Sequence, residues 1–490
     1  MLLTDEDLLM RLGLAALLLS AYPIFKAIYN LYFHPLASFP GPSSWAASRL
    51  PYVFSLLTGT IVQDIEKLHR KYGPILRVAP NEVTFAHPDA WNDIFQDPLW
   101  WGRSPGRAES IISAEGNDHA RIRKLISYGF TPRALRVQEP IVQKYVSLFI
   151  EKLSEQVQGQ TTVKVDVVPW FNYYTFDLFG ELGFGESFNC LQNSRYHPWI
   201  TLVFNSVKAA SFVTSTRFYP LIEFVLMKCI PASLKKTQEQ HFQHIVDKVE
   251  RRLNWEVQKP DIMSYIIEHN EKDKSMTLGE IQTLFSGLVT AGSETTATFL
   301  AGTVNHLVQN PMIMATLVSE IRQSFDKESD ITFEAMSKLP YLTAVINEGL
   351  RLCPPVPVML PRVVPEGGDT VCGLWMPEGT SISIQAWSLF RDPTLFHRAD
   401  EYLPQRWLEA ENPNSQYFQD RRDVVTPFSL GPRGCLGKDL AWAEIRLVLI
   451  KLLWTFDLTA TTNLLKWENL RTFLLVEKKP VEVNIKHRSA

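Results

Sequence analysis

Hydrophobic positions along this 490-residue chain recur mostly with the spacing of amphipathic helices. Residues 73–85 instead alternate and contain a Pro-Asn turn, which predicts a β-hairpin and the one clear sheet before the C-terminal third. The pattern therefore predicts a mainly α fold with a small β part. Between residues 118 and 258 it predicts helices broken by prolines, which remove a backbone donor, at Pro132, Pro140, Pro169, Pro198, Pro220 and Pro231.

Two apolar stretches predict the longest buried helices. Thr277 and Glu280 form a capping box, and the apolar pattern that follows continues until Asn310 and Pro311 end it. A helix of about 32 residues is roughly 48 Å long, which is enough to cross a whole domain. The second stretch, residues 440–456, predicts a buried helix directly after a glycine-rich loop.

The N-terminal segment has the pattern of a membrane anchor. Residues 8–25 are almost entirely apolar and, at about 1.5 Å per residue, reach roughly 27 Å, just enough to span a bilayer core. A cleaved secretory signal is the alternative, but the preceding residues are acidic and no clear small-residue cleavage site follows. We expect a single-pass anchor in residues 1–33, a stiff proline-rich hinge in residues 34–42 and one continuous domain in residues 43–490.

Composition narrows the choice of partners and of compartment. The net charge is −3 and no long basic run occurs, so nucleic acid is not an expected partner. The five cysteines are scattered without a C-x-x-C pair, which argues against a disulfide framework and against a structural zinc site. This cysteine usage fits a reducing compartment.

Candidate chemistry begins with Cys435, which lies in the loop FSLGPRGCLG ahead of the second apolar stretch. Unpaired N–H groups and the positive end of a helix dipole favour a thiolate there, and a thiolate is a strong ligand for iron. Gly431, Gly434 and Gly437 allow a tight turn and a close approach to a flat ligand. The alternative is a free and inert cysteine that caps a helix.

A resemblance favours the iron ligand. Phe428, Gly431, Arg433, Cys435 and Gly437 have the spacing F-x-x-G-x-R-x-C-x-G, which resembles the haem-binding signature of the cytochrome P450 monooxygenases. The resemblance implies a fold in which a long central helix lies over haem b and the cysteine loop lies on the proximal side. Cys435 would then be the axial ligand of the haem iron.

The segment AGSETT, near the centre of the predicted long helix, resembles the oxygen-activation motif A-G-x-D/E-T-T of the same family. Ala291 and Gly292 remove bulk where a flat cofactor could lie, and Thr295 can hydrogen-bond to the preceding helical turn. The resemblance implies that Glu294 and Thr295 are the acid and the alcohol that deliver protons during oxygen activation. Glutamate is an alternative to aspartate that the motif admits, with a longer reach.

Further positions match the family's site. Glu348 and Arg351 match its E-x-x-R, and Arg406 in PQRW would complete a structural network, although Gln405 replaces the usual acidic residue. The resemblance implies that the haem propionates are bound by guanidinium groups and one histidine, namely Arg123, Arg362, Arg433 and His119. It also implies a substrate pocket, mostly apolar, lined by residues 100–112, 212–224, 287–291, 356–360 and 473–474.

The resemblance implies an NADPH- and O2-dependent monooxygenase that acts on a lipophilic small molecule. No G-x-G-x-x-G fingerprint follows a strand, so we expect electrons to arrive from a flavoprotein reductase that docks near Lys124, Arg133 and Lys438. The anchor implies the endoplasmic reticulum membrane, with the catalytic domain on the cytosolic side. The segment YNLYFHPLASFPGP most resembles filamentous-fungal members that act in secondary metabolism.

Two other functions stay open within the same fold. The first is a family member that isomerises or dehydrates its substrate without activating O2, and it has no need of the acid and alcohol at Glu294 and Thr295. The second is a non-enzymatic haem sensor or carrier, which needs neither a reductase nor a long pocket lining. Consumption of NADPH that depends on both the reductase and the substrate separates the three functions.

Overall fold

The computed structural model describes residues 21–94, 107–229, 232–256, 259–273, 275–357 and 361–488. Most of the predicted membrane span therefore lies outside the described residues, and residues 21–32 form a helix that leads into the hinge. In the described part of the chain, no helix combines the length and the apolar character needed to cross a membrane.

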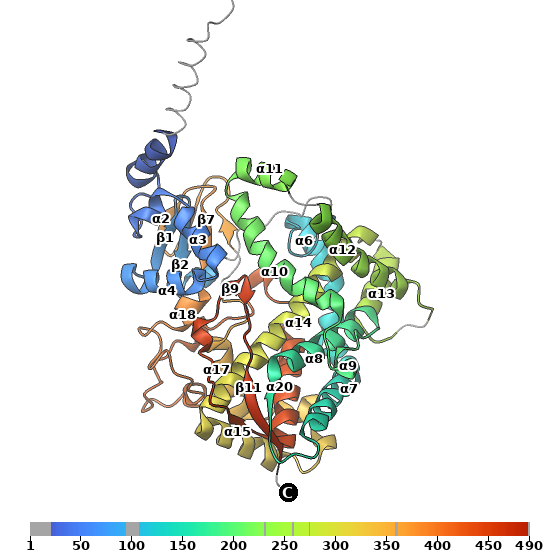
Figure 1. The fold of residues 1–490 in the computed structure, drawn as a ribbon. Helices are drawn as coiled ribbons and strands as arrows, with labels where there is room; N and C mark the ends of the chain where they lie inside the picture. Colours follow the sequence, from blue (N-terminus) through green and yellow to red (C-terminus); the bar gives the residue numbers. More distant parts are fainter. Residues whose placement is uncertain are drawn as a thin grey trace, which may run out of the picture.

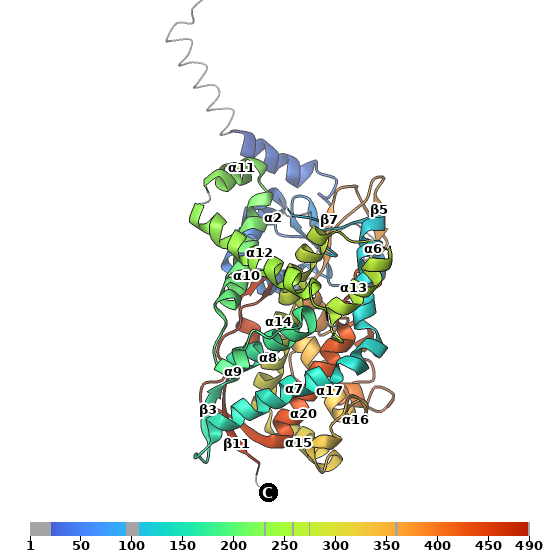
Figure 2. The same cartoon turned by 90° about the vertical axis from the view of Figure 1, so that its right-hand side faces the viewer.

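Most of the chain is helical, as predicted. Figures 1 and 2 show a helical part that surrounds α14, with a smaller β part beside the N-terminal segment. The α-helices are α2 (Ser43–Ala47), α3 (Leu50–Thr58), α4 (Ile61–Tyr72), α5 (Ala90–Ile94), α6 (Gly116–Ser127), α7 (Pro132–Val157), α8 (Val167–Phe184), α9 (Cys190–Asn193), α10 (Pro198–Arg217), α11 (Pro220–Cys229), α12 (Ala232–Leu253), α13 (Ile262–Asp273), α14 (Leu278–Gln309), α15 (Pro311–Ser324), α16 (Phe333–Met336), α17 (Pro340–Leu352), α18 (Ala386–Phe390), α19 (Gln405–Leu408) and α20 (Lys438–Thr455). Short 3₁₀ turns are η1 (Tyr128–Phe130), η2 (Glu328–Asp330), η3 (Arg422–Val424), η4 (Gly431–Arg433) and η5 (Trp467–Asn469).

Helix α14 is the predicted long helix, and it crosses the middle of the helical part (Figure 1). Its 32 residues begin after the predicted capping box, in which the Thr277 hydroxyl accepts from the Glu280 N–H and the Glu280 carboxylate accepts from the Thr277 N–H. It packs most extensively on α8 and also contacts α12, α17 and α20. Since its C-terminal half is buried almost all round, α14 is a core element rather than a surface helix.

Among the described residues, the β part consists of four small sheets. The largest has the strand order β1-β2-β7-β4, in which β1 and β2 are the predicted hairpin and β2 pairs in parallel with β7. The other sheets have the orders β3-β11-β8, β10-β9 and β5-β6. The strands are β1 (Ile75–Ala79), β2 (Glu82–Phe85), β3 (Val163–Asp166), β4 (Arg362–Val363), β5 (Asp369–Val371), β6 (Leu374–Met376), β7 (Ser381–Ile384), β8 (Phe456–Ala460), β9 (Thr472–Phe473), β10 (Leu475–Val476) and β11 (Glu482–His487).

Two details of the sequence prediction were wrong. Strand β3 lies within the region predicted to be helical, because its pairing partner β11 comes from the far end of the chain. The break predicted at Pro140 does not occur either, since α7 continues through this proline from Pro132 to Val157. Packing of α7 on α8 and α20 stabilises the helix on both sides of the proline.

We predict that Gly302→Ala destabilises the protein. A Cβ atom on Gly302 of α14 would lie 2.8 Å from Cβ and Sγ of Cys353 and 3.0 Å from Trp467. Overpacking a filled core costs about 1–3 kcal/mol, which exceeds the helix propensity gained, about 1 kcal/mol. We expect thermal denaturation to show a lower melting temperature than for the wild type.

Gly279→Ala, in the first turn of the same helix, is the matched control. Its Cβ would meet Ala108 Cβ at 3.5 Å, an ordinary contact, so only the propensity gain remains. A Gly302→Ala protein that is as stable as the Gly279→Ala protein would show that this part of the core is not tightly packed.

Candidate functional site

The loop that contains Cys435 is held in one shape by its own backbone. Ser429 and Gly431 adopt left-handed conformations, with φ of 60° and 69°, and the Cys435 N–H donates to the Phe428 carbonyl at 2.7 Å. This bond closes the loop just before α20 begins at Lys438, one residue after Gly437. The predicted placement of the thiol at a helix entrance is therefore confirmed.

The Cys435 side chain is open to solvent but closely flanked by protein. Burial raises the pKa of the Cys435 thiol, while the N–H of Gly437 and the charges of Arg123 and Lys438 act in the opposite direction. The thiol is thus accessible and has cations beside it, and coordination of a metal ion would deprotonate it outright. The net result is a raised pKa, so the protein surroundings alone do not favour the thiolate that the sequence analysis expected. The exposure of the thiol still fits a metal ligand better than an inert buried cysteine.

Three guanidinium groups and one imidazole gather near this thiol. His119 and Arg123 lie on α6, Arg362 begins β4, and Arg433 lies in η4. Burial and then the charges of Arg433, Arg123 and Arg362 lower the pKa of His119 to about 4, so all four side chains are close enough to interact. At neutral pH His119 is therefore uncharged and can offer an N–H rather than a further positive charge.

The cation cluster formed by Arg123, Arg362 and Arg433 fits an anionic ligand. Burial lowers the pKa of Arg433, Arg123 adds to this effect, and Glu115 partly opposes it. Gathering partly desolvated like charges is unfavourable unless an anion compensates them. Two propionates of a haem beside the Cys435 thiol would supply that charge, so these residues fit the implied cofactor.

Part of the Arg433 side chain is already engaged. Its guanidinium donates to the carbonyls of Ile111 at 3.3 Å, Ile112 at 3.4 Å and Ala114 at 2.5 Å. Arg433 therefore ties the loop before α6 to the cysteine loop. This clamp places one wall of the predicted substrate pocket against the residues that would hold the cofactor.

A small-residue stripe on α14 lies open within an otherwise buried helix. Ala291 is exposed and Thr295 is half-buried, whereas Ser293, Glu294 and Thr296 are buried. The Thr295 hydroxyl donates to the Ala291 carbonyl at 2.6 Å, as predicted. Ala291 and Thr295 are one turn apart and so share one face, and this face can accept a flat group or a small molecule.

Gly292 serves a different purpose from the one predicted. A Cβ atom at Gly292 would lie 2.6 Å from Cδ2 of Phe179 on α8. The absence of a side chain there allows α8 and α14 to approach closely, and of the two small residues only Ala291 borders the open face. No local pattern predicts this contact, because Phe179 is far away along the chain.

Glu294 is buried next to Thr295 in the sequence, and its carboxylate forms an ion pair. Its Oε1 lies 2.5 Å from Nζ of Lys478, and the two side chains are only 9% and 6% exposed. Lys478 Nζ also donates to the Thr298 hydroxyl at 3.1 Å. Sequence reasoning missed Lys478, since it stands in an ordinary-looking Glu-Lys-Lys-Pro run near the C-terminus.

The predicted glutamate–arginine network is present and fully buried. Arg351 forms a bidentate pair with Glu348, with N–O distances of 2.8 and 3.0 Å, and Arg406 Nε lies 3.0 Å from Glu348 Oε1. The side chains of all three residues are 0% exposed. Burial raises the pKa of Glu348, but the guanidinium groups of Arg351 and Arg406 outweigh it and hold that pKa below its usual range.

The network extends beyond the residues that the sequence predicted. Trp407 Nε1 donates to Glu348 Oε2 at 2.9 Å, and the Leu403 N–H donates to Oε1 at 2.8 Å. Asp420 forms an ion pair with Arg406. Because Asp420 lies shortly before the cysteine loop, this chain of contacts connects α17 with the approach to Cys435.

Parts of the predicted substrate pocket lie outside the described residues, namely residues 100–106 and 358–360. Among the described parts, Ile112 faces Gly287 of α14, and β9 packs on α10. Leu474, between β9 and β10, has a left-handed conformation with φ of 66°. Some of the segments that were predicted to line the substrate pocket are therefore neighbours in the structure.

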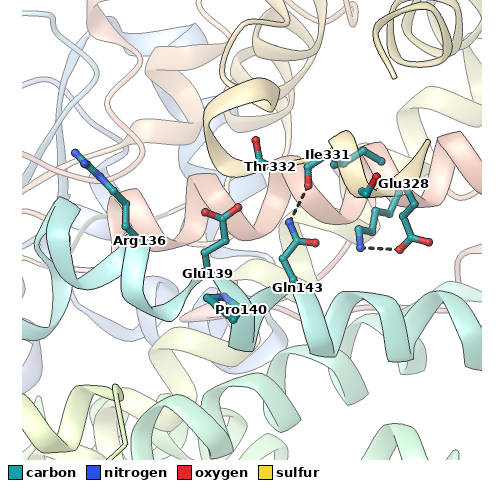
Figure 3. A pocket seen from close by; sticks show the side chains of 9 residues that line it. Arg136, Glu139, Pro140, Gln143, Glu328, Ile331 and Thr332 are labelled. Atoms are coloured by element: carbon teal, nitrogen blue, oxygen red, sulfur yellow. Dashed lines mark hydrogen bonds and ion pairs between the residues drawn. The ribbon is translucent and has the colours of Figure 1, made fainter. Parts of the chain in front are cut away.

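A separate pocket of about 470 Å³ lies between α7, η2 and α20, as Figure 3 shows. Its lining is mostly polar and includes Arg136, Glu139, Gln143, Glu328 and Lys451. Lys451 is 13 residues along α20 from Lys438, and at about 1.5 Å per helical residue this pocket is roughly 20 Å away from the end of the helix that follows the cysteine loop. It is not part of the candidate site.

The structure thus has the features that the resemblance implied for a haem-thiolate protein. They are an accessible thiol at a helix entrance, a cation cluster beside it and a small-residue stripe on a long central helix. The profile of the Cytochrome P450 family matches residues 42–485. The chain is 38% identical over 481 residues to cytochrome P450 monooxygenase astJ of Aspergillus oryzae, which covers 96% of this chain and 95% of that protein. It is 38% identical over 488 residues to cytochrome P450 monooxygenase astA of Talaromyces wortmannii, with 98% and 97% covered.

A third relative is averantin hydroxylase of Dothistroma septosporum, 39% identical over 453 residues, with 91% of this chain and 84% of that protein covered. The chain belongs to the cytochrome P450 family. It is an oxidoreductase of the monooxygenase class, and the family implies a haem cofactor. The mainly α fold with a small β part is confirmed by the same findings.

We predict that Glu348→Gln strongly destabilises the protein, because it leaves two buried guanidinium groups without their shared carboxylate. Removing one partner of a buried ion pair costs about 3–5 kcal/mol. Chemical denaturation should show a loss of this size in the free energy of unfolding, together with a lower haem content after purification.

Glu334→Gln is the matched control, since Glu334 pairs with Lys338 at 3.3 Å in an ion pair whose side chains are 86% and 70% exposed. Exposed pairs contribute roughly 0–1 kcal/mol. If the two variants were equally stable, the buried network would not hold the fold together.

Proposed function

We propose that this enzyme inserts one atom of O2 into a lipophilic small molecule of secondary metabolism, with hydroxylation as the principal reaction. The observation that carries the proposal is the Ala291–Thr295 stripe, which presents an alcohol on the open face of α14 beside the buried Glu294. An isomerase or dehydratase of the family has no use for that acid and alcohol. The names of three relatives, two monooxygenases and one hydroxylase, support the same reaction class.

The roles of the residues follow from their positions. Arg123, Arg362, Arg433 and His119 would bind the haem propionates, and Cys435 would be the ligand of the iron. Phe428 and Gly437 would shape the cysteine loop, and Ala291 would leave room for the cofactor on α14. When bound, haem supplies reductive oxygen activation, with the thiolate as electron donor. Thr295 would hold a proton at its hydroxyl for delivery to the open face, and Glu294 would replenish it.

The substrate proposed is apolar. The predicted pocket is lined mostly by aliphatic and aromatic side chains, and the open face of α14 adds only Ala291 and the Thr295 hydroxyl as a polar group. Such a pocket binds by burial of apolar surface and orients its ligand by few polar contacts. A lipophilic small molecule suits this lining better than a charged one.

Electrons would come from NADPH through a flavoprotein reductase. Lys124, Arg133 and Lys438 are exposed, and Lys438 begins α20 directly behind the cysteine loop. Positive charges at this face would steer an acidic partner toward the haem edge. The flavins and NADPH are thus cofactors of the partner rather than of this chain.

We place the enzyme on the endoplasmic reticulum membrane, held by the N-terminal anchor, with the catalytic domain in the cytosol. Exposed large apolar side chains near the start of the described chain support this, since Phe25 and Phe33 are 68% and 71% exposed. Leu221 and Phe224 of α11 are exposed as well, and Figures 1 and 2 show α11 at the same end of the molecule as the N-terminal helix. Apolar side chains gathered at one end suit contact with lipid.

We predict that Cys435→Ser abolishes the thiolate-type absorption spectrum of the reduced carbon monoxide complex, because serine does not supply the sulfur ligand. Cys372→Ser is the control, since Cys372 is partly exposed, follows β5 and donates its N–H to Asp93 rather than to a residue of the site. An unchanged spectrum in the Cys435→Ser protein would refute the ligand assignment.

We predict that Thr295→Ala keeps its haem but releases more hydrogen peroxide per NADPH consumed, because proton delivery to the open face is impaired. General acid groups contribute about 10²–10⁴-fold in rate, so peroxide should become the main product. Thr283→Ala is the control, since the Thr283 hydroxyl makes the same type of bond to Gly279, at 2.8 Å, in the first turns of α14. Equal peroxide yields in the two variants would remove Thr295 from the proton path.

A further inference from the structure

The ion pair between Glu294 and Lys478 joins the candidate acid to a segment far away in the sequence. Lys478 follows β10 (Leu475–Val476) and reaches α14, where its Nζ lies 2.5 Å from Glu294 Oε1. Both side chains are more than nine-tenths buried. Burying two charges costs desolvation energy, so a buried ion pair contributes little net stability. It does hold the carboxylate in one position.

The two carboxylate oxygens of Glu294 have different surroundings. Oε1 accepts from Lys478, whereas Oε2 is buried and has no hydrogen-bond donor among the described residues. Buried carboxylate oxygens normally accept hydrogen bonds, from protein or from ordered water. Oε2 is therefore the oxygen that is available to take up a proton.

Lys478 is itself held against α14. Its Nζ donates to the Thr298 hydroxyl at 3.1 Å, and Thr298 is 0% exposed and lies one turn beyond Glu294. Burial lowers the pKa of the Lys478 ammonium, and Glu294 acts against that effect. Thr298 and Glu294 thus fix the ammonium group on one flank of the helix, adjacent to the open face that Thr295 borders.

We propose that Lys478 is a positioning residue for proton delivery, which holds the Glu294 carboxylate by Oε1 so that Oε2 takes up a proton supplied by the bulk solvent and passes it toward Thr295. The carboxylate returns to its ionised, paired state after each transfer, so charge balances over the cycle. This inference rests on the proposed role of Glu294 and Thr295. It differs from a purely structural role, in which the pair only pins the C-terminal segment to α14.

The placement of Lys478 also connects this acid with the substrate pocket. Lys478 lies four residues after Leu474, whose left-handed turn between β9 and β10 belongs to the predicted pocket lining. A single short segment therefore carries both a pocket residue and the counter-ion of the acid.

The test compares Lys478→Met with Lys478→Arg and with Lys479→Met, which removes an exposed lysine next to it. With reductase, NADPH and O2 alone, we expect the peroxide released per NADPH to rise in Lys478→Met as far as in Glu294→Gln, about fivefold or more given the usual contribution of a positioned acid. Lys478→Arg and Lys479→Met should stay within about twofold of the wild type, because the first keeps the cation and the second is remote.

An infrared measurement tests the ion pair without turnover. A buried carboxylate that loses its cation favours the neutral acid, so Lys478→Met should gain a protonated-carboxyl band that is absent from the Lys478→Met/Glu294→Gln double variant. Burial raises the pKa of Glu444 to about 8, so that carboxyl contributes to every spectrum and cancels in the difference. If the ion pair only pinned the C-terminal segment to α14, Lys478→Met would not release more peroxide per NADPH.

The outcomes separate this inference from the function on which it rests. If Glu294→Gln releases more peroxide per NADPH and Lys478→Met does not, the role of Lys478 is overturned and Glu294 remains the acid. If Glu294→Gln releases no more peroxide than the wild type, Glu294 is not the acid of the proton path. If Lys478→Met does not fold, Thr298→Val, which removes a partner of Lys478, should give a smaller rise, and its absence would overturn the proposal.

Discussion

The site depends on one buried carboxylate, that of Glu348. Two guanidinium groups, an indole N–H and a backbone N–H converge on its two oxygens in a region without solvent. Such a network is stable only if every member is satisfied, because any one charge left alone would be strongly destabilising. Through Arg406 and Asp420 it anchors the segment that leads into the cysteine loop.

The part of the candidate site on α14 depends on close packing rather than on buried charges. Helix α14 is packed tightly against α8, so tightly that Gly292 cannot carry a side chain, yet Ala291 and Thr295 on its other face lie open. Rigid packing behind a small-residue stripe keeps an open face from collapsing. The Glu294–Lys478 ion pair lies on the same part of α14 and is largely shielded from water.

The sequence predicted what depends on near neighbours. The capping box at Thr277, the hairpin turn at Pro80 and the E-x-x-R spacing of Glu348 and Arg351 act within a few residues, and all three occur as expected. Strand β3, the close approach of Phe179 to Gly292 and the pairing of Lys478 with Glu294 were missed. Each of these joins residues more than 100 positions apart, and no local pattern encodes such a partner.

The central claim is that this enzyme transfers an oxygen atom from O2 to a lipophilic metabolite. The most direct measurement is metabolite profiling of a host that contains, or lacks, this chain together with a reductase, grown under isotopically heavy O2. We expect a metabolite that appears only with the chain and that carries one heavy oxygen atom. A metabolite that is converted without taking up the label would contradict the claim and favour an isomerase or a dehydratase of the same family.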